Sequence, residues 1–301
     1  MNKTVTIFGG SGFIGGHIIR RLSKLGFRII VPVSDLSSAP RLRLYGNLGQ
    51  ILPIRNNLEL DFFKKVISES DFVINLRTIW KEEKNKNFLT EIYNFNKIII
   101  NEIKKDKRKK YIFFSGIGIK INSQSKRTNA IANSEKSIQE NLTNYSIIRP
   151  SVVIGLEDKF MNRIIPLIKH FFIIPIFGKG IAKFQPVYVD DVAKAIEKII
   201  IKSDAEADIY ELGGNNVITY KQLYNFIIDE LGKKRLLINI PFPLAKFGTI
   251  LIEKTPFDII NSEQLQLFAS DNVVTGQHKL FKNLNIEPRD VMQIIKNIID
   301  K

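Results

Sequence analysis

A short apolar run, a glycine cluster and an amphipathic helix open the chain and constrain its fold more than any other feature. Residues 4–8, TVTIF, have the β-branched and aromatic character of a buried strand. Apolar side chains then recur at helical spacing up to Gly26, where the helix is expected to end. The next run, RIIVPV (28–33), reads as a second strand. This order predicts a parallel βαβ unit.

Glycines stand at the turn between the first strand and the helix. Glycine lets the backbone turn tightly and approach a pyrophosphate, and the helix N-terminus offers free N–H groups to the anion. A glycine triplet in this position, unlike one met elsewhere in a chain, is strong support for a dinucleotide site. The residues expected to contact the nucleotide here are Gly9, Ser11, Gly12, Phe13, Ile14 and Gly15.

The end of the second strand bears on the choice between NAD(H) and NADP(H). An acid there would bind a ribose 2′-OH, whereas a nearby arginine would accept a 2′-phosphate. Val33 occupies the acid position, and Ser34 could donate a hydrogen bond to a 2′-phosphate. Asp35 would repel that phosphate if it pointed inward, while Arg41 and Arg43 are basic candidates from the following loop. We expect NADP(H) to be preferred.

Further strand-like segments alternate with helical patterns at 49–58, 71–76, 111–116 and 145–153. Such alternation predicts an α/β fold with a Rossmann-type, doubly wound parallel sheet. Ligands of such sheets lie at the carboxyl ends of the strands. The candidates at those ends are Asn57, Leu58, Leu76, Arg77, Ser115, Pro150 and Val153.

Composition excludes several kinds of site and leaves the origin of the charge open. The 301 residues include no cysteine and only three widely spaced histidines, so neither a metal site nor a thiol nucleophile is expected. The net charge of +15 suits either an acidic partner, such as anionic lipid headgroups, or a composition rich in Lys, Ile and Asn. The run 104–110 reads as a solvated helix end. No nucleic-acid-binding motif is present, so no nucleic-acid partner is expected.

The chain also resembles the extended short-chain dehydrogenases/reductases over nearly all of its length. The segments that carry the resemblance are GGSGFIG, FFSGIG, RPSVVIG and FQPVYVDDVAKAI. Three further segments, SVVIGLEDKFMNR, YELGG and LFASDNVV, are similar to the atypical members related to the NADPH-binding accessory subunit of respiratory complex I. Two of them, YELGG and LFASDNVV, lie outside the nucleotide fold, which makes them more specific than the glycine motif.

This resemblance implies a Rossmann lobe of residues 1–155 and 183–215, and a smaller lobe of 156–182 and 216–301. It implies partners in respiratory complex I or quinone biosynthesis. Apolar segments of the second lobe, including 236–257, form either lobe core or a surface that docks on an anionic membrane. The start of the first strand at Lys3 and the absence of an 18-residue apolar span favour the bacterial cytoplasm or the cytoplasmic face of the inner membrane.

In the short-chain dehydrogenases/reductases that this chain resembles, the active members carry Tyr-x-x-x-Lys on the helix before the sixth strand. Alignment on SEKSI puts Arg127 at the tyrosine position and Ile131 at the lysine position, which leaves Ser115 as the remnant of the catalytic set. Arginine does not release its proton near neutral pH and isoleucine has none to release. The leading hypothesis is a non-catalytic dinucleotide-binding protein. The alternatives are an NAD(P)-dependent epimerase, dehydratase or reductase with an altered acid/base, and a nucleotide-sensing regulator without a fixed complex.

Overall fold

A computed structural model describes the chain except for residues 1–2, 203–205, 253–260 and 301. The described residues divide into two compact units. Unit 1 comprises residues 1–150, 189–211 and 276–287, and unit 2 comprises 151–188, 212–275 and 288–301.

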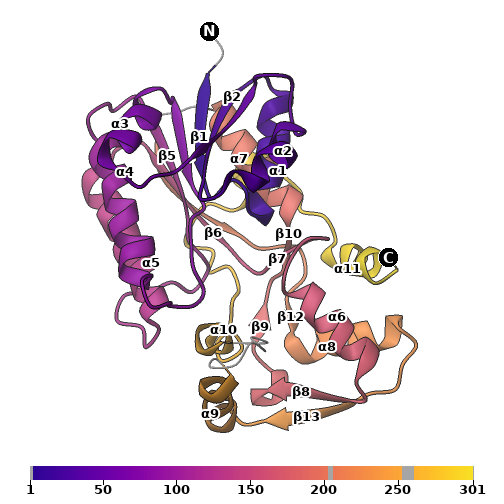
Figure 1. Ribbon diagram of the computed structural model, residues 1–301. Coiled ribbons are helices and arrows are strands. Elements are labelled where there is room, and N and C mark those ends of the chain that lie inside the picture. The colour runs from indigo at the N-terminus through magenta and orange to yellow at the C-terminus, as the bar shows by residue number, and fades with distance from the viewer. Residues whose placement is uncertain (1–2, 203–205, 253–260, 301) are drawn as a thin grey trace. The chain divides into compact units, whose positions relative to one another are not determined.

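Unit 1 is built on a seven-stranded sheet in the order β11-β6-β5-β4-β1-β2-β3 (Figure 1). The neighbours from β6 to β3 pair in parallel. The chain moves outward from β1 to β3 and then returns to place β4 on the other side of β1, which creates a topological switch point. The predicted Rossmann-type α/β fold is confirmed. Its strands are β1 (Thr4–Phe8), β2 (Arg28–Val33), β3 (Ile51–Arg55), β4 (Phe72–Asn75), β5 (Lys110–Phe114), β6 (Tyr145–Pro150) and β11 (Ala207–Leu212).

Helices cover both faces of this sheet (Figure 1). On one face α1 (Phe13–Lys24) packs against α7 (Val189–Lys202), and Arg21 donates hydrogen bonds of 2.8 Å to both carboxylate oxygens of Asp190. On the other face three helices share an apolar core with the strands. They are α3 (Leu60–Ser68), α4 (Phe95–Ile103) and α5 (Lys126–Asn141). The shorter elements of unit 1 are η1 (Leu36–Ser38), α2 (Ala39–Arg43), the π-helix η2 (Leu89–Asn94) and η4 (Phe281–Leu284).

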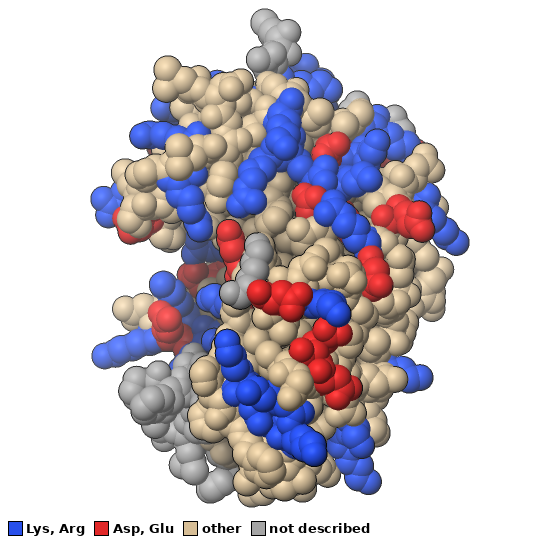
Figure 2. Space-filling view, turned by 90° about the vertical axis from the view of Figure 1, so that its right-hand side faces the viewer, with Lys and Arg blue, Asp and Glu red and all other residues tan. Residues whose placement is uncertain are grey.

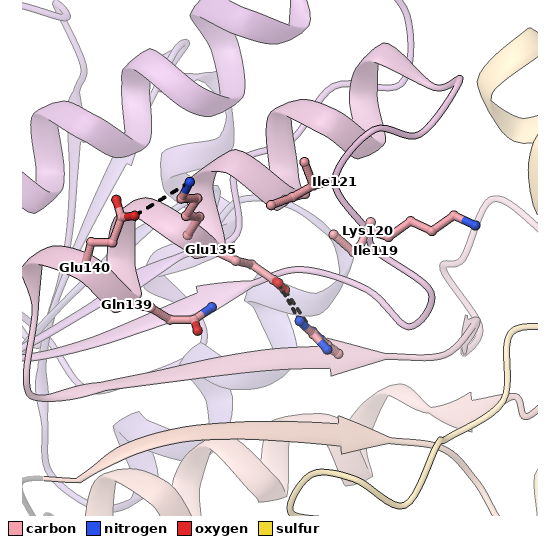
Figure 3. A pocket seen from close by; sticks show the side chains of 9 residues that line it. Ile119, Lys120, Ile121, Glu135, Gln139 and Glu140 are labelled. Carbon is pink, nitrogen blue, oxygen red and sulfur yellow. Dashed lines mark hydrogen bonds and ion pairs between the residues drawn. The ribbon is translucent and has the colours of Figure 1, made fainter.

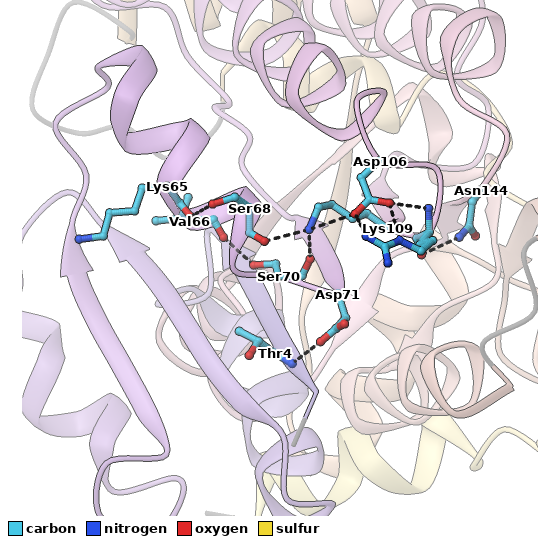
Figure 4. A network of polar contacts seen from close by, with 10 residues as sticks. Thr4, Lys65, Val66, Ser68, Ser70, Asp71, Asp106, Lys109 and Asn144 are labelled. Atoms are coloured by element: carbon cyan, nitrogen blue, oxygen red, sulfur yellow. Dashed lines mark hydrogen bonds and ion pairs between the residues drawn. The ribbon is translucent and has the colours of Figure 1, made fainter. Parts of the chain in front are cut away.

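The basic run 104–110 does more than end a helix in solvent. Lys109 donates from Nζ to the carbonyls of Ser68 at 3.1 Å and Ser70 at 2.6 Å, so it ties the start of β5 to the start of β4 (Figure 4). Lys110 is only 4% exposed. Elsewhere the basic side chains are dispersed among acidic ones on the face that Figure 2 shows.

Unit 2 has its own core, formed where short strands meet the helices α6, α8 and α11, whose ranges are given below. Phe184 stacks on Tyr220 with ring centroids 4.4 Å apart, and Phe160 and Phe268 pack against the same tyrosine. Its strands are β7 (Val153–Ile154), β8 (Ile173–Phe177), β9 (Lys183–Phe184), β10 (Val187–Tyr188), β12 (Ile218–Thr219) and β13 (Leu236–Ile240). Its helices are α6 (Met161–His170), η3 (Gly178–Gly180), α8 (Tyr220–Glu230), α9 (Phe242–Ile252), α10 (Ser262–Leu267) and α11 (Val291–Ile299).

The unit boundaries differ from the predicted lobes most clearly at residues 276–287, which were assigned to the smaller lobe. Lys279 N donates to Ile209 O at 3.0 Å and Glu211 N donates to Lys279 O at 2.8 Å, so this segment extends β11 of unit 1. The chain also passes from one unit to the other between residues 150 and 151, 188 and 189, and 211 and 212, and these positions differ from the predicted boundaries. Within the described residues, no helix is both long and apolar enough to cross a bilayer.

A buried charge cluster joins α5 to the end of β6. Arg149 donates to both carboxylate oxygens of Glu135, at 2.9 and 2.6 Å (Figure 3). Its guanidinium also lies 3.9 Å from Glu211 and 3.1 Å from a ring nitrogen of His278. Glu135 and Glu211 are 4% and 2% exposed, so the positive charge of Arg149 offsets part of the negative charge of two carboxylates that have little access to water.

We predict that Arg149→Leu lowers the free energy of unfolding by about 3–5 kcal/mol, because it removes the cation that pairs with both oxygens of the buried Glu135 carboxylate. Lys136→Ala is the matched control, since Lys136 and Glu140 form an exposed pair at 3.8 Å on the same helix (Figure 3). That control should cost less than about 1 kcal/mol. Urea denaturation measures both variants, and equal losses would contradict a special role for the buried cluster.

Candidate functional site

The loops that follow the parallel strands of unit 1 meet at one edge of the sheet. Leu76 N donates to Phe8 O at 2.9 Å, which joins the loop after β4 to the end of β1. Asn56 N donates to Val33 O at 2.8 Å, and Ser115 N donates to Ile148 O at 2.8 Å. The structure therefore brings most of the predicted nucleotide residues to the edge where doubly wound sheets bind ligands.

The glycine turn requires two of its three predicted glycines for the fold itself. Gly9 has a φ of +77°, and a Cβ there would lie 3.0 Å from the carbonyl carbon of Leu76. A Cβ on Gly15 would lie 2.4 Å from Gly10 O, closer than real Cβ contacts allow. Gly12 differs, because its φ is −78° and a Cβ there would meet only Gly9 O, at 3.3 Å. Gly12 thus leaves space beside the turn.

The N-terminus of α1 is free of competing side chains. No side chain caps it and its first turn holds no acidic residue. The first N–H groups of an α-helix have no acceptor within the helix, and here they belong to Phe13, Ile14 and Gly15. These donors and the positive end of the helix dipole can hold a phosphate group.

The carboxylate of Asp35 forms hydrogen bonds within its own loop. Its carboxylate accepts hydrogen bonds from the hydroxyl and the N–H of Ser37, and these bonds lower the pKa of Asp35. Arg41 extends from α2 to donate to Ser11 O at 2.7 Å, which places its guanidinium against the glycine turn. Val33 is 3% exposed, and Ser34 follows it on the surface. The local charge available beside the turn is therefore that of Arg41.

Two buried polar atoms at this edge have no hydrogen-bond partner among the described residues: Arg77 Nε and Ser115 Oγ. The other end of the Arg77 guanidinium pairs with Glu91 and lies 4.5 Å from the centre of the Phe95 ring. Buried polar atoms are normally paired, because an unpaired one costs about 1–3 kcal/mol. An occupant with polar groups would satisfy them. This observation and the open flank of Gly12 fit a dinucleotide.

The helix α5 shows what became of the expected tyrosine and lysine positions. Arg127 donates from Nε to Ile79 O at 3.0 Å and from Nη2 to Thr78 Oγ1 at 3.1 Å. Its guanidinium lies 3.7 Å from the centre of the Trp80 ring. Ile131 is 3% exposed and packs in the core shared by α3, α4 and α5. Arg127 ties α5 to the loop after β4, and Ile131 fills space beneath it.

The remaining candidates occupy different surroundings. Leu58 is 51% exposed and has a φ of +60°, a conformation that is costly for a branched side chain. Pro150 O accepts a hydrogen bond from Ile117 N at 3.2 Å, which places it beside the loop after β5. Val153 belongs to β7 of unit 2. Among the residues that the structure describes, no group of three His, Cys, Asp or Glu side chains could hold a metal ion.

Sequence reasoning missed the buried cluster around Arg149 and the partners of Arg77. The cluster borders a cavity of about 390 Å³ beside α5, lined also by Lys120, Gln139 and Glu140 (Figure 3). A signal existed, because an arginine closing a buried strand and a glutamate in an apolar helix face both need partners. Glu91 gave no such signal, since its helix begins with a π-turn that shifts the expected faces.

Comparison with known proteins identifies relatives in the respiratory chain. The chain is 32% identical to "NADH dehydrogenase [ubiquinone] 1 alpha subcomplex subunit 9, mitochondrial" of Arabidopsis thaliana, over 94% of this chain and 74% of the relative. It is 25% identical to the NADH-ubiquinone oxidoreductase 40 kDa subunit, mitochondrial, of Neurospora crassa, over 96% of this chain and 76% of the relative.

Solved structures with the same fold include sugar-nucleotide enzymes. A UDP-glucuronic acid 4-epimerase from Bacillus cereus, in complex with UDP-glucuronic acid and NAD, matches with a TM-score of 0.73 and 14% identity, over 99% of this chain and 98% of that one. A dTDP-glucose 4,6-dehydratase from Bacillus anthracis, in complex with NAD, gives 0.72 and 15%, over 99% and 96%. Residues 1–296 match the NmrA-like family, which confirms the resemblance to atypical short-chain dehydrogenases/reductases, and the chain belongs to that family.

Proposed function

We propose that the chain binds a nicotinamide dinucleotide at the glycine-turn edge of unit 1 and keeps it as a structural ligand without turnover. The observation that carries the proposal is the pairing of an uncapped helix N-terminus with buried, unpartnered polar atoms on the same sheet edge. A ligand that binds only the folded state adds stability by mass action, about 2.7 kcal/mol at a hundredfold excess over its Kd.

The residues that would hold the dinucleotide come from several strand ends. The turn at Gly9, Gly12 and Gly15 and the N–H groups of α1 would hold the pyrophosphate. The other contacts that we propose within unit 1 are Ser11, Phe13, Ile14, Ser34, Asn57, Leu58, Leu76, Arg77, Ser115 and Pro150. When bound, a nicotinamide group supplies hydride chemistry. The residues listed here would position that group, and Arg127 and Ile131 would supply no proton to a developing alkoxide.

The proposed partner is respiratory complex I, because the relatives are subunits of that enzyme. A quinone-biosynthesis protein is the second proposed partner. The proposed location is the cytoplasm of a bacterium or the cytoplasmic face of its inner membrane, with peripheral contact to anionic lipid. The alternative function, an epimerase, dehydratase or reductase with an altered acid/base, is supported by the sugar-nucleotide enzymes that share the fold.

We predict that Gly12→Val abolishes dinucleotide binding and lowers the melting temperature of the unliganded protein less than Gly15→Ala does. The Cβ at Gly12 meets only one backbone oxygen, at 3.3 Å, but the side chain would fill the approach of a pyrophosphate. Thermal melting with millimolar NAD(H) or NADP(H) measures the loss.

Gly15→Ala is the contrasting variant for this test. Its Cβ would lie 2.4 Å from Gly10 O, so it should lower the melting temperature even without ligand. If the wild type shows no melting shift with either dinucleotide, the turn does not bind one and the proposal is wrong.

The proposed preference for NADP(H) rests on Arg41 at the turn and on the commitment of Asp35 to Ser37. We predict that Arg41→Ala weakens NADP(H) binding about tenfold or more and changes NAD(H) binding little, because a charge-assisted bond to a 2′-phosphate would be lost. Arg43→Ala, on the same helix, is the control. Isothermal calorimetry with both cofactors measures the effect, and tighter binding of NAD(H) by the wild type would reverse the assignment.

The wild-type protein should show no steady turnover on a broad panel of carbonyl compounds and nucleotide sugars, followed by the absorbance of reduced nicotinamide. A positioned general acid contributes roughly 10²–10⁴ in rate, and Arg127 and Ile131 cannot supply it. Turnover that survives Arg127→Ala and disappears with Ser115→Ala would favour the enzymatic alternative.

Introducing the family's lysine at position 131 should destabilise the fold, so it is a poor test of lost activity. Ile131 is 3% exposed, so Ile131→Lys would bury an ammonium group and should destabilise the fold strongly. Ile131→Met, which keeps an apolar side chain of similar volume, should cost less than about 1.5 kcal/mol. The difference between the two melting temperatures measures how far this position has become core.

A further inference from the structure

The small sheet of unit 2 presents an apolar outer face. Strands β8 and β13 run parallel, with Leu236 opposite Ile173 and Ile238 opposite Pro175. Side chains alternate across a strand, so these four lie on one face, while Ile174 lies on the other and is fully buried in the core of unit 2. One face of the sheet thus supports the unit, and the opposite face is apolar without being covered.

Two further exposed apolar side chains stand directly before β8 in the chain. Phe171 and Phe172 are 60% and 62% exposed, and Ile173 is 53% exposed. Leu236 and Ile238 are 51% and 41% exposed. Single exposed apolar residues are ordinary, but a contiguous group marks an interaction surface. These five residues are called the apolar patch below.

Basic side chains flank the apolar patch on both of its chain segments. Lys169 and His170 end α6 just before Phe171, and Lys233 and Lys234 precede Leu236. All four are exposed, and the structure gives the three lysines no carboxylate partner among the residues it describes. These four residues are called the basic rim.

Arg235 fixes the basic rim beside the apolar patch. It donates to the carbonyl oxygens of Ile168 at 2.6 Å and Lys169 at 3.0 Å, which satisfies the C-terminus of α6. Leu236 N donates to Phe172 O at 2.9 Å. The end of α6 and the start of β13 are therefore held together, and their lysines border the same apolar surface.

We propose that the apolar patch and the basic rim form a docking surface for an anionic lipid bilayer. Large apolar side chains would enter the interface while the ammonium groups pair with headgroup phosphates. A second copy of this chain fits less well, because it would bring two basic rims together. This inference rests on the membrane contact named in the proposed function and adds the residues that would make that contact. Residues 253–257 of the apolar segment noted in the sequence lie outside the described residues.

Vesicle co-sedimentation with the full chain tests this surface. The wild type should bind vesicles of phosphatidylcholine with added phosphatidylglycerol, and bind vesicles of phosphatidylcholine alone at least about tenfold more weakly. Phe171→Ser with Phe172→Ser should reduce binding at least about tenfold, and Lys233→Glu with Lys234→Glu should remove the preference for anionic vesicles.

Matched controls come from unit 1. Leu44 and Leu48, 84% and 106% exposed, give the control Leu44→Ser with Leu48→Ser, and Lys104→Glu with Lys107→Glu changes charge to the same extent elsewhere. Both controls should bind vesicles as the wild type does. Equal losses in patch and control variants would show binding by net charge alone and overturn the proposal. So would self-association in light scattering that only the phenylalanine variant abolishes.

The melting shift with dinucleotide separates this proposal from the proposed function. Patch variants should keep the wild-type melting temperature and its shift, since the substituted side chains are exposed. If the protein binds vesicles but its melting temperature does not change with dinucleotide, the docking surface is supported and the structural-ligand proposal is wrong. If the melting temperature rises with dinucleotide but the protein does not bind vesicles, the structural-ligand proposal is supported and the docking surface is wrong.

Discussion

The approach of the first helix to the first strand is the constraint on which unit 1 depends. A Cβ at Gly15 would overlap the carbonyl of Gly10, so the backbones can meet only where residue 15 has no side chain. That contact places the N-terminus of α1 at the sheet edge, and the loops after the other strands are then bonded to the same edge in turn. Any ligand of this unit meets uncapped N–H groups because of it.

The helix α5 holds the two residues expected at the family's tyrosine and lysine positions, and both contribute to the fold. Arg127 binds the loop after β4 through two hydrogen bonds and a ring contact, so it orders a segment that borders the nucleotide edge. Ile131 adds to the core instead of exposing an amine. Both side chains thus hold α5 in place, one through the loop after β4 and the other through the core.

Much of unit 1 could be predicted from the sequence because its signals are local. The strands β1 to β6 are short apolar runs. Gly9 and Gly15 mark the turn after β1, because a side chain at either position would collide with nearby backbone. The partners of Arg149 and Arg77 could not be predicted in this way, since they depend on which elements face each other. The return of residues 276–287 to unit 1 was missed for the same reason, because backbone pairing with β11 has no sequence signature.

That return has a consequence for the order in which the chain can fold during synthesis. His278 meets Arg149 across 129 residues, and Lys279 closes the outer side of β11 through backbone hydrogen bonds. The N-terminal half can form its parallel strands and the Arg149–Glu135 pair early, but the contacts of Arg149 with His278 and of β11 with Lys279 wait until almost the whole chain has left the ribosome. Contacts of such long sequence separation form late and slowly. The outer side of β11 therefore lacks its backbone partner at Lys279 until late in synthesis.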